Sequence, residues 1–196
     1  AGSFDLTYLS CLPNFVVMAP SSGEELKNMI NLSLSIKDRP SAIRYPRDLA
    51  GNYDNKKPFQ SIKIGKGKII KKGKKIAFLN LGTRLKQVFE TSKLIKNQFE
   101  IDSTIVDMRF AKPIDKLLLK SLLKNHDILI TIEENAIGGF SSQVNDYLLN
   151  SIDNTPKILN FFMKDEFIDQ SDIGDQYLQS GISPELIVKR VSKLLK

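Results

Sequence analysis

Short apolar runs and amphipathic segments alternate along most of the chain. Residues 15–19 form a continuous apolar run and residues 41–45 are the next strand candidate, and between them apolar side chains recur every three or four positions as far as Lys37. Continuous apolar runs are typical of strands buried on both faces, and the spacing between them indicates an amphipathic helix. Because parallel strands need such a crossover, residues 15–45 predict a strand–helix–strand unit in a parallel sheet.

Helical spacing also predicts which side chains share a face in this first region. The helix after Ser22 is expected to bury one face, made of Leu26, Met29, Ile30, Ser33 and Leu34. One or two helical turns near the start of the chain place three apolar residues together, Phe4, Tyr8 and Leu12.

A second and longer alternation begins at Lys75. Strands are predicted at residues 76–81, 103–107, 127–132 and 157–161. Helices are predicted up to about residues 98, 124 and 150, the second of them starting at Pro113 or Ile114. A short helix is expected within 171–180, and a last helix opened by Ser183-Pro184 ends at Leu195. Repeated strand–helix units of this length predict an α/β fold, a doubly wound and mostly parallel sheet with helices on both faces.

A polar segment separates the two regions and predicts a domain boundary. Residues 51–61 are expected to form a linker. The strand–helix–strand unit in residues 1–50 is too small to form its own core, so it is interpreted as the last part of a domain whose earlier strands are missing. Residues 62–196 are expected to form a complete domain.

The segment from Lys56 to Lys75 contains nine lysines and no acidic residue. It could bind an anionic ligand, but its isoleucines alternate with lysines, and lysine commonly protects edge strands. We therefore interpret it as a solvated hairpin with its turn at residues 72–74.

Composition narrows the classes of function. The net charge of +7 comes mostly from lysine, a typical solvated surface cation, so no nucleic-acid partner is predicted. No apolar run is long enough to cross a bilayer and no secretory signal is visible, so no membrane partner is predicted. The single cysteine, Cys11, is expected to be buried and inert, and fits a reducing, cytoplasmic location.

Candidate chemistry lies where strands end, since ligands of open α/β sheets bind beyond the carboxyl ends of the strands. Arg44 and Arg47 follow the strand at residues 41–45. Arginine is suited to bidentate binding of phosphate or carboxylate, yet a structural salt bridge is equally compatible with this spacing.

The adjacent carboxylates Glu133 and Glu134 follow another strand and precede Gly138-Gly139. They could bind a metal or act in acid–base chemistry. Neighbouring residues of an extended segment point in opposite directions, however, so hydrogen bonding that anchors the loop or an interface is the favoured interpretation.

Other polar positions are given structural interpretations. Residues 82–84 are expected to form a tight turn and helix cap rather than a phosphate site. Asp107 and Arg109 are expected to form an internal ion pair. His126, the only histidine, precedes a strand at its amino end and is expected to lie at the surface or at a helix end.

Several strings of residues occur in a characteristic order over nearly the whole chain. They are Gly2–Asp5, Tyr8-Leu9, Leu12–Asn14, Met18–Ser21, Pro40–Arg47, Ile64–Gly67, Val106–Phe110, Lys112–Asp115 and Glu133–Ala136. In this order they resemble the 1-deoxy-D-xylulose-5-phosphate synthases, thiamine-diphosphate enzymes that share their domain plan with transketolases.

The resemblance implies a homodimeric enzyme of three α/β domains that uses thiamine diphosphate and Mg²⁺. It implies condensation of pyruvate with glyceraldehyde 3-phosphate and loss of carbon dioxide, for isoprenoid, thiamine and pyridoxal precursors. The chain matches the end of the pyrimidine-binding domain, within residues 1–50, and the transketolase C-terminal-type domain. The family's cofactor and catalytic motifs have no counterpart in this sequence, so the chain alone is expected to bind no cofactor and to be inactive.

Only one functional residue is carried over from the family. Arg47 matches the arginine that binds the substrate phosphate, whereas Arg44 is interpreted as a structural neighbour. Two other functions remain open: a part resembling the beta subunit of a 2-oxo-acid dehydrogenase, and a non-catalytic α/β assembly module.

Overall fold

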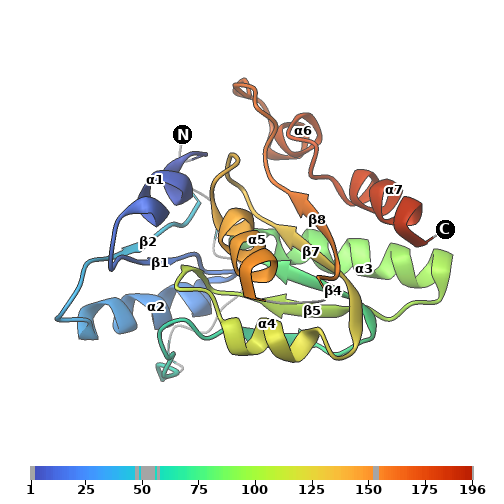
Figure 1. Ribbon diagram of the computed structural model, residues 1–196. Helices are drawn as coiled ribbons and strands as arrows, with labels where there is room; N and C mark the ends of the chain where they lie inside the picture. The colour runs from blue at the N-terminus through green and yellow to red at the C-terminus, as the bar shows by residue number, and fades with distance from the viewer. Residues whose placement is uncertain (1–2, 47–48, 50–55, 57, 152–154, 196) are drawn as a thin grey trace.

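The computed structural model describes residues 3–46, 49, 56, 58–151 and 155–195. Two sheets lie side by side (Figure 1). The smaller has the strand order β2 (Ser41–Ile43), β1 (Val16–Met18), β6 (Phe110–Lys112). The larger has the order β3 (Lys68–Lys71), β5 (Thr104–Asp107), β4 (Lys75–Asn80), β7 (His126–Ile132), β8 (Lys157–Phe161).

The larger sheet is parallel from β5 to β8 and has one antiparallel edge strand, β3. The prediction of a mostly parallel α/β sheet is therefore confirmed. The predicted hairpin is wrong in its pairing, because β3 pairs with β5, which separates it from β4. The turn at residues 72–74 passes over the start of β5, and the Gly73 N–H donates a 2.8 Å hydrogen bond to Thr104 Oγ1.

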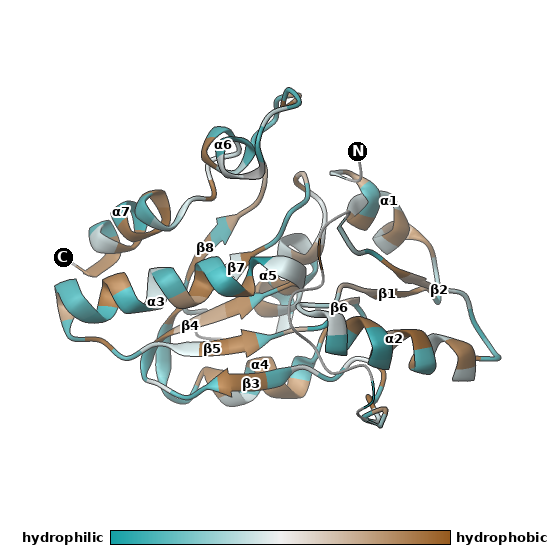
Figure 2. Cartoon of the chain, turned by 180° about the vertical axis from the view of Figure 1, so that it is seen from behind, coloured by the Kyte–Doolittle hydropathy of each residue, from teal (hydrophilic) through white to brown (hydrophobic). Residues whose placement is uncertain are grey.

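Helices cover both faces of this sheet, as predicted. Alternate residues of β4 point to opposite sides, because side chains alternate along a strand. Ile76 and Phe78 pack with α3 (Leu85–Phe99) and α7 (Pro184–Leu195), and α3 lies in front of the sheet in Figure 2. Ala77 and Leu79 pack on the other face with α4 (Lys116–Leu122) and α5 (Phe140–Ser151).

The start of α4 differs from the prediction. The helix begins at Lys116, after Asp115, rather than at Pro113 or Ile114. The Asp115 side chain accepts a hydrogen bond from the Leu118 amide, and an aspartate at this position satisfies a free donor of the first turn. None of the described helices is long and apolar enough to cross a membrane.

The faces that the two helices of the first region bury differ from the sequence prediction. In α2 (Gly23–Ser35) Met29 is buried as predicted, together with Glu25 and Asn28, whereas the Ile30 and Leu34 side chains are 46% and 68% exposed. The start of α2 is as expected, with Ser22 as its N-cap.

In α1 (Asp5–Cys11) the predicted apolar face, Phe4, Tyr8 and Leu12, is exposed, and Leu6 is buried instead. Cys11 is exposed, so the expectation of a buried thiol is wrong. Leu6 joins the core that also contains Leu79 and Phe140, so α1 packs on the larger unit.

Strand β6 links the two regions. It comes from the second region and pairs antiparallel with β1 of the first. Phe110 of β6 and Ile62 pack in one cluster with Met18 and Met29. Most of the predicted linker, residues 51–61, lies outside the described residues. The division into two domains remains a prediction. The pairing of β6 with β1 crosses any such boundary.

Candidate functional site

Glu134 is the centre of a polar cluster beyond the carboxyl ends of both sheets. It follows β7, Arg44 follows β2, and Thr83 and Arg84 follow β4 in the 3-10 turn η1 (Gly82–Arg84). Tyr177 comes from α6 (Ile173–Gln179). In Figure 1, α1 and α6 stand on either side of the loop after β7. Sheet topology therefore brings residues from four distant segments to the edge where α/β proteins bind ligands.

The two carboxylate oxygens of Glu134 contact different parts of this cluster. Glu134 Oε2 lies 3.5 Å from Arg44 Nη1. Glu134 Oε1 accepts hydrogen bonds from the Tyr177 hydroxyl at 2.8 Å and the Thr83 hydroxyl at 3.3 Å. Arg84 Nη1 lies 3.8 Å from the same oxygen. One carboxylate thus bridges an arginine of the first region and three residues of the second.

Arg84 is the most deeply buried member, with a fully buried side chain. Its Nη2 donates a 2.8 Å hydrogen bond to the Ile182 carbonyl, and its guanidinium carbon lies 3.5 Å from the centre of the Tyr177 ring. An uncompensated buried charge is costly, so the Glu134 carboxylate and the ring face both stabilise this cation. Burial, and then the Glu134 charge, raise the pKa of Tyr177 above its usual value, so its hydroxyl remains a donor.

Arg44 is held by its main chain and its side chain. Its N–H donates a 2.8 Å hydrogen bond to the Met18 carbonyl, which extends the β1–β2 pairing. Its Nη2 donates a 2.6 Å hydrogen bond to the Glu134 carbonyl, and its Nε lies 3.6 Å from Asp5 Oδ2. These contacts place the Arg44 side chain in a network of ion pairs within the protein.

Glu133 and Asn135 anchor the loop on either side of Glu134. Fully buried Glu133 accepts hydrogen bonds from the amides of Phe140 at 2.8 Å and Ser141 at 2.7 Å, at the start of α5. Burial raises the pKa of Glu133, and these amides oppose that effect. Asn135 Oδ1 accepts a 3.2 Å hydrogen bond from the Leu6 amide at the start of α1.

The two adjacent glutamates therefore point to different partners, as the alternation along an extended segment predicts. Glu133 makes loop-anchoring hydrogen bonds, and Glu134 makes the ion pairs across the two sheets. In the part of the chain that the structure describes, no group of three or more His, Cys, Asp or Glu side chains could hold a metal ion.

A second buried polar cluster lies where β5 meets the smaller sheet. The Ser21 hydroxyl donates a 2.5 Å hydrogen bond to Asp107 Oδ2, and the Arg109 amide donates to Asp107 Oδ1. The Arg109 side chain pairs with Glu25 at 2.6 Å, so the predicted Asp107–Arg109 ion pair is wrong in its acidic partner. Burial, helped by the Glu25 charge, raises the pKa of Asp107 to about 6.

Two other structural interpretations agree with the contacts. Residues 82–84 form a tight 3-10 turn, in which Gly82 has a φ of +76° and lies against Ala19. The His126 ring lies at the end of α4, with Nδ1 2.6 Å from the Leu122 carbonyl and Nε2 2.7 Å from Thr104 Oγ1. It is buried rather than at the surface.

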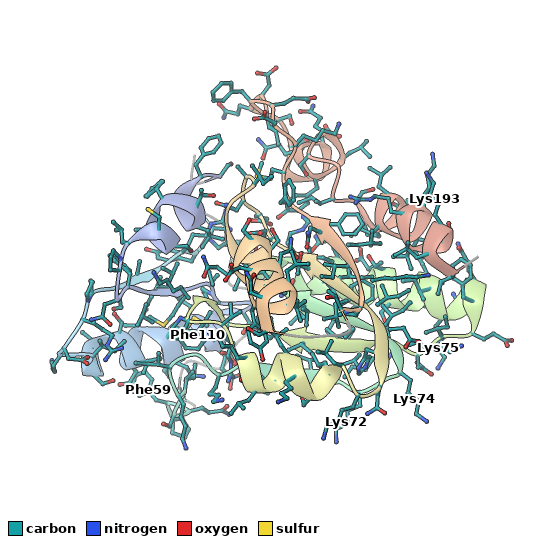
Figure 3. All side chains as sticks on the ribbon, viewed as in Figure 1. Phe59, Lys72, Lys74, Lys75, Phe110 and Lys193 are labelled. Carbon is teal, nitrogen blue, oxygen red and sulfur yellow. The ribbon has the colours of Figure 1, made fainter. Side chains whose placement is uncertain are left out.

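Four lysines of the predicted hairpin lie at the opposite, amino-terminal end of β4: Lys71, Lys72, Lys74 and Lys75. Figure 3 labels Lys72, Lys74 and Lys75 at this turn. Nearby, Lys71 and Lys96 both pair with Asp102, at 3.1 and 2.9 Å. The acidic side chain between them supports a solvated ionic surface.

Arg47 lies outside the described residues, so its predicted phosphate contact is untested. The sequence analysis missed Tyr177, Asp5 and Glu25. Each pairs with a residue at least 39 positions away in the chain (5 with 44, 25 with 109, 134 with 177). No local spacing signals such pairs.

Known proteins resemble this chain over nearly its whole length. Residues 65–187 match the family described as "Transketolase, C-terminal domain". The chain is 36% identical over 198 residues to 1-deoxy-D-xylulose-5-phosphate synthase 1, chloroplastic, from Cannabis sativa, covering 99% of this chain and 27% of that protein.

A solved structure named "Split gene transketolase, inactive beta4 tetramer" has a TM-score of 0.83 and 26% sequence identity. The match covers 96% of this chain and 60% of that one. This chain therefore spans about a quarter of the length of the plant relative, and somewhat over half of the structural neighbour.

Proposed function

This chain belongs to the family of transketolase C-terminal domains, and on that premise we propose that it forms the C-terminal part of a 1-deoxy-D-xylulose-5-phosphate synthase. The observation that carries the proposal is 36% identity to a synthase of that name across 99% of the chain. The whole enzyme would condense pyruvate with glyceraldehyde 3-phosphate and release carbon dioxide.

The proposed reaction depends on thiamine diphosphate and Mg²⁺, which would supply the decarboxylation chemistry. The described residues do not offer a fitting set of metal ligands. We therefore assign neither group to this chain and propose that it is inactive alone. Its contribution is to recognise the phosphorylated acceptor and to support the segment that does so.

Arg47 is the residue that we propose binds the acceptor phosphate, by its match to the family motif and by the suitability of arginine for phosphate. In the active enzyme, Arg47→Ala should raise the KM for glyceraldehyde 3-phosphate, with less effect on unphosphorylated glyceraldehyde. Arg39→Ala is the matched control, since Arg39 lies at the surface and pairs with its neighbour Asp38. Unchanged kinetics for Arg47→Ala would remove it from the site.

The function itself is tested by an assay with pyruvate, glyceraldehyde 3-phosphate, thiamine diphosphate and Mg²⁺. We expect turnover when the chain is present together with the cofactor-binding part of the enzyme, joined or as a separate polypeptide, and none from the chain alone. Absence of deoxyxylulose phosphate in the combined assay would overturn the proposed function. Turnover by the chain alone would overturn its proposed inactivity.

We also propose that the enzyme is a cytoplasmic homodimer. The similar split-gene transketolase is itself described as a tetramer, and the single cysteine fits a reducing compartment. Sedimentation of the active enzyme at twice its chain mass would support the dimer, and sedimentation as a monomer would exclude it.

A further inference from the structure

The carboxyl end of β2, an edge strand, is held both by main-chain pairing with β1 and by the side chain of Arg44. Residues 41–43 pair with β1, and the Arg44 amide adds one further hydrogen bond to the Met18 carbonyl. The Arg44 side chain then reaches across to the larger unit, where Nη2 donates a 2.6 Å hydrogen bond to the Glu134 carbonyl. The residue that ends this strand is therefore located relative to both sheets.

The charge of Glu134 is central to this arrangement. Its side chain is 13% exposed and lies between Arg44, 15% exposed, and the fully buried Arg84. Electrostatic attraction is stronger in such partly dehydrated surroundings than in water. A glutamine of the same shape would offer one oxygen and one amide group, so it would leave an arginine or Tyr177 facing a donor.

The larger unit in turn locates Glu134. The residues on either side of it cap helices: Glu133 accepts from the α5 amides, and Asn135 accepts from the Leu6 amide of α1. Tyr177 and Arg84 hold Oε1 from a third direction. Because these contacts hold the Glu134 carboxylate in one place, its ion pair with Arg44 can hold the Arg44 side chain in one place too.

We propose that Glu134 is a positioning residue, which holds Arg44 and thereby orients the start of the segment that leads from β2 into the acceptor-phosphate site. This inference rests on the proposed function, in which Arg47, three residues after Arg44, binds the phosphate. Glu134 touches neither substrate nor cofactor in this scheme. Its effect is transmitted through the Arg44 ion pair.

A positioning role predicts a selective kinetic defect. In the active enzyme, Glu134→Gln should lower kcat/KM for glyceraldehyde 3-phosphate by about 10- to 100-fold, because displacing a binding group by an ångström has effects of this order. The same variant should change kcat/KM for unphosphorylated glyceraldehyde by less than about threefold. Tyr177→Phe, which removes one hydrogen bond to Glu134, should show the same selectivity with a smaller loss.

Hydrogen–deuterium exchange of this chain gives a second readout that needs no activity. Glu134→Gln should speed exchange of the amides at residues 41–45, whereas helix α3 should be unchanged. Glu90→Gln is the matched control, since Glu90 is an exposed glutamate on α3 and the substitution is identical. We expect wild-type kinetics and exchange for this control.

The outcomes separate the inference from the function on which it rests. If the wild-type enzyme forms no deoxyxylulose phosphate, the proposed function fails, and faster exchange at residues 41–45 would still support the positioning of Arg44. If Glu134→Gln loses activity equally with both acceptors, or leaves exchange at residues 41–45 unchanged, the positioning role is overturned. If Glu134→Gln does not fold, Tyr177→Phe is judged by the same criteria.

Discussion

Asp107 is the carboxyl group whose ionisation should be visible in the stability of the protein. It is 1% exposed at the end of β5, and its pKa is raised to about 6 from an ordinary 3.8, chiefly by burial. The perturbation that we consider is Asp107→Asn. The side-chain oxygen of an asparagine can still accept the hydrogen bond from the Arg109 amide. Its NH₂ group can donate a hydrogen bond to the Ser21 hydroxyl, because a hydroxyl can accept as well as donate.

The sign of the pH effect follows from proton binding in the two states. Between about pH 4 and pH 6 the folded protein keeps the Asp107 proton and the unfolded chain has lost it. Because the folded state binds more protons, the free energy of unfolding falls as the pH rises through this window and is level above it. A difference of about 2.2 pKa units corresponds to about 3 kcal/mol, at 1.36 kcal/mol per unit.

The assay is urea unfolding followed by far-ultraviolet circular dichroism at a series of pH values from 4 to 7. Relative to wild type, Asp107→Asn should gain about 3 kcal/mol in free energy of unfolding between the lowest and highest pH. Asp127→Asn is the matched control, because Asp127 also lies in a strand but is exposed. Parallel pH profiles for wild type and Asp107→Asn would refute the argument from burial.

Two further predictions concern local packing. Glu133→Gln should lower the free energy of unfolding by about 1–3 kcal/mol, because one of the two α5 amides then faces an amide donor inside the core. Gly73→Ala should cost about 1–3 kcal/mol, because its Cβ would overlap the backbone at Asp102. Gly174→Ala, in α6 with open space around it, should instead be neutral or stabilising by up to about 1 kcal/mol, and equal losses for the two glycines would contradict the steric argument. Thermal and urea unfolding measure all three variants.

The larger sheet was predictable because its strands are long, continuous apolar runs separated by helices of regular length. Strands β4, β5, β7 and β8 are within two residues of their predicted ends. The hairpin was mispaired for a physical reason. A short lysine-rich strand next to a tight turn favours its sequence neighbour locally, whereas β3 gains more by closing the edge of the sheet against β5.

The exposed apolar face of α1 and the pairing of β6 with β1 could not be read from the sequence. Periodicity identifies which residues share a face, but not which face meets the core. Phe4 and Tyr8 share a face that the structure leaves exposed, while Leu6 meets the core. The partner of Arg109 was missed similarly, since Glu25 is 84 positions away, in helix α2 of the first region.

The candidate site was predictable in part of its composition but not in its connectivity. Sequence position placed Arg44, Arg84 and Glu134 at strand ends, and the parallel topology brings such ends to one edge. Only the structure shows that one carboxylate serves both arginines. Spacing left two interpretations open for Arg44, a ligand site or a salt bridge, and the ion pairs that the structure shows depend on the relation between the two sheets.

Through the two polar clusters, the second region holds the ends of the strand–helix–strand unit of the first region. At one junction Arg109 and Asp107 hold Glu25 and Ser21 at the start of α2. At the other, Glu134 holds Arg44 at the end of β2. A strand–helix–strand unit is too small to fix its own geometry, so its ends are located by the larger sheet. The selectivity expected of Glu134→Gln tests this dependence directly: a residue of the second region would then control how well the phosphorylated acceptor is used.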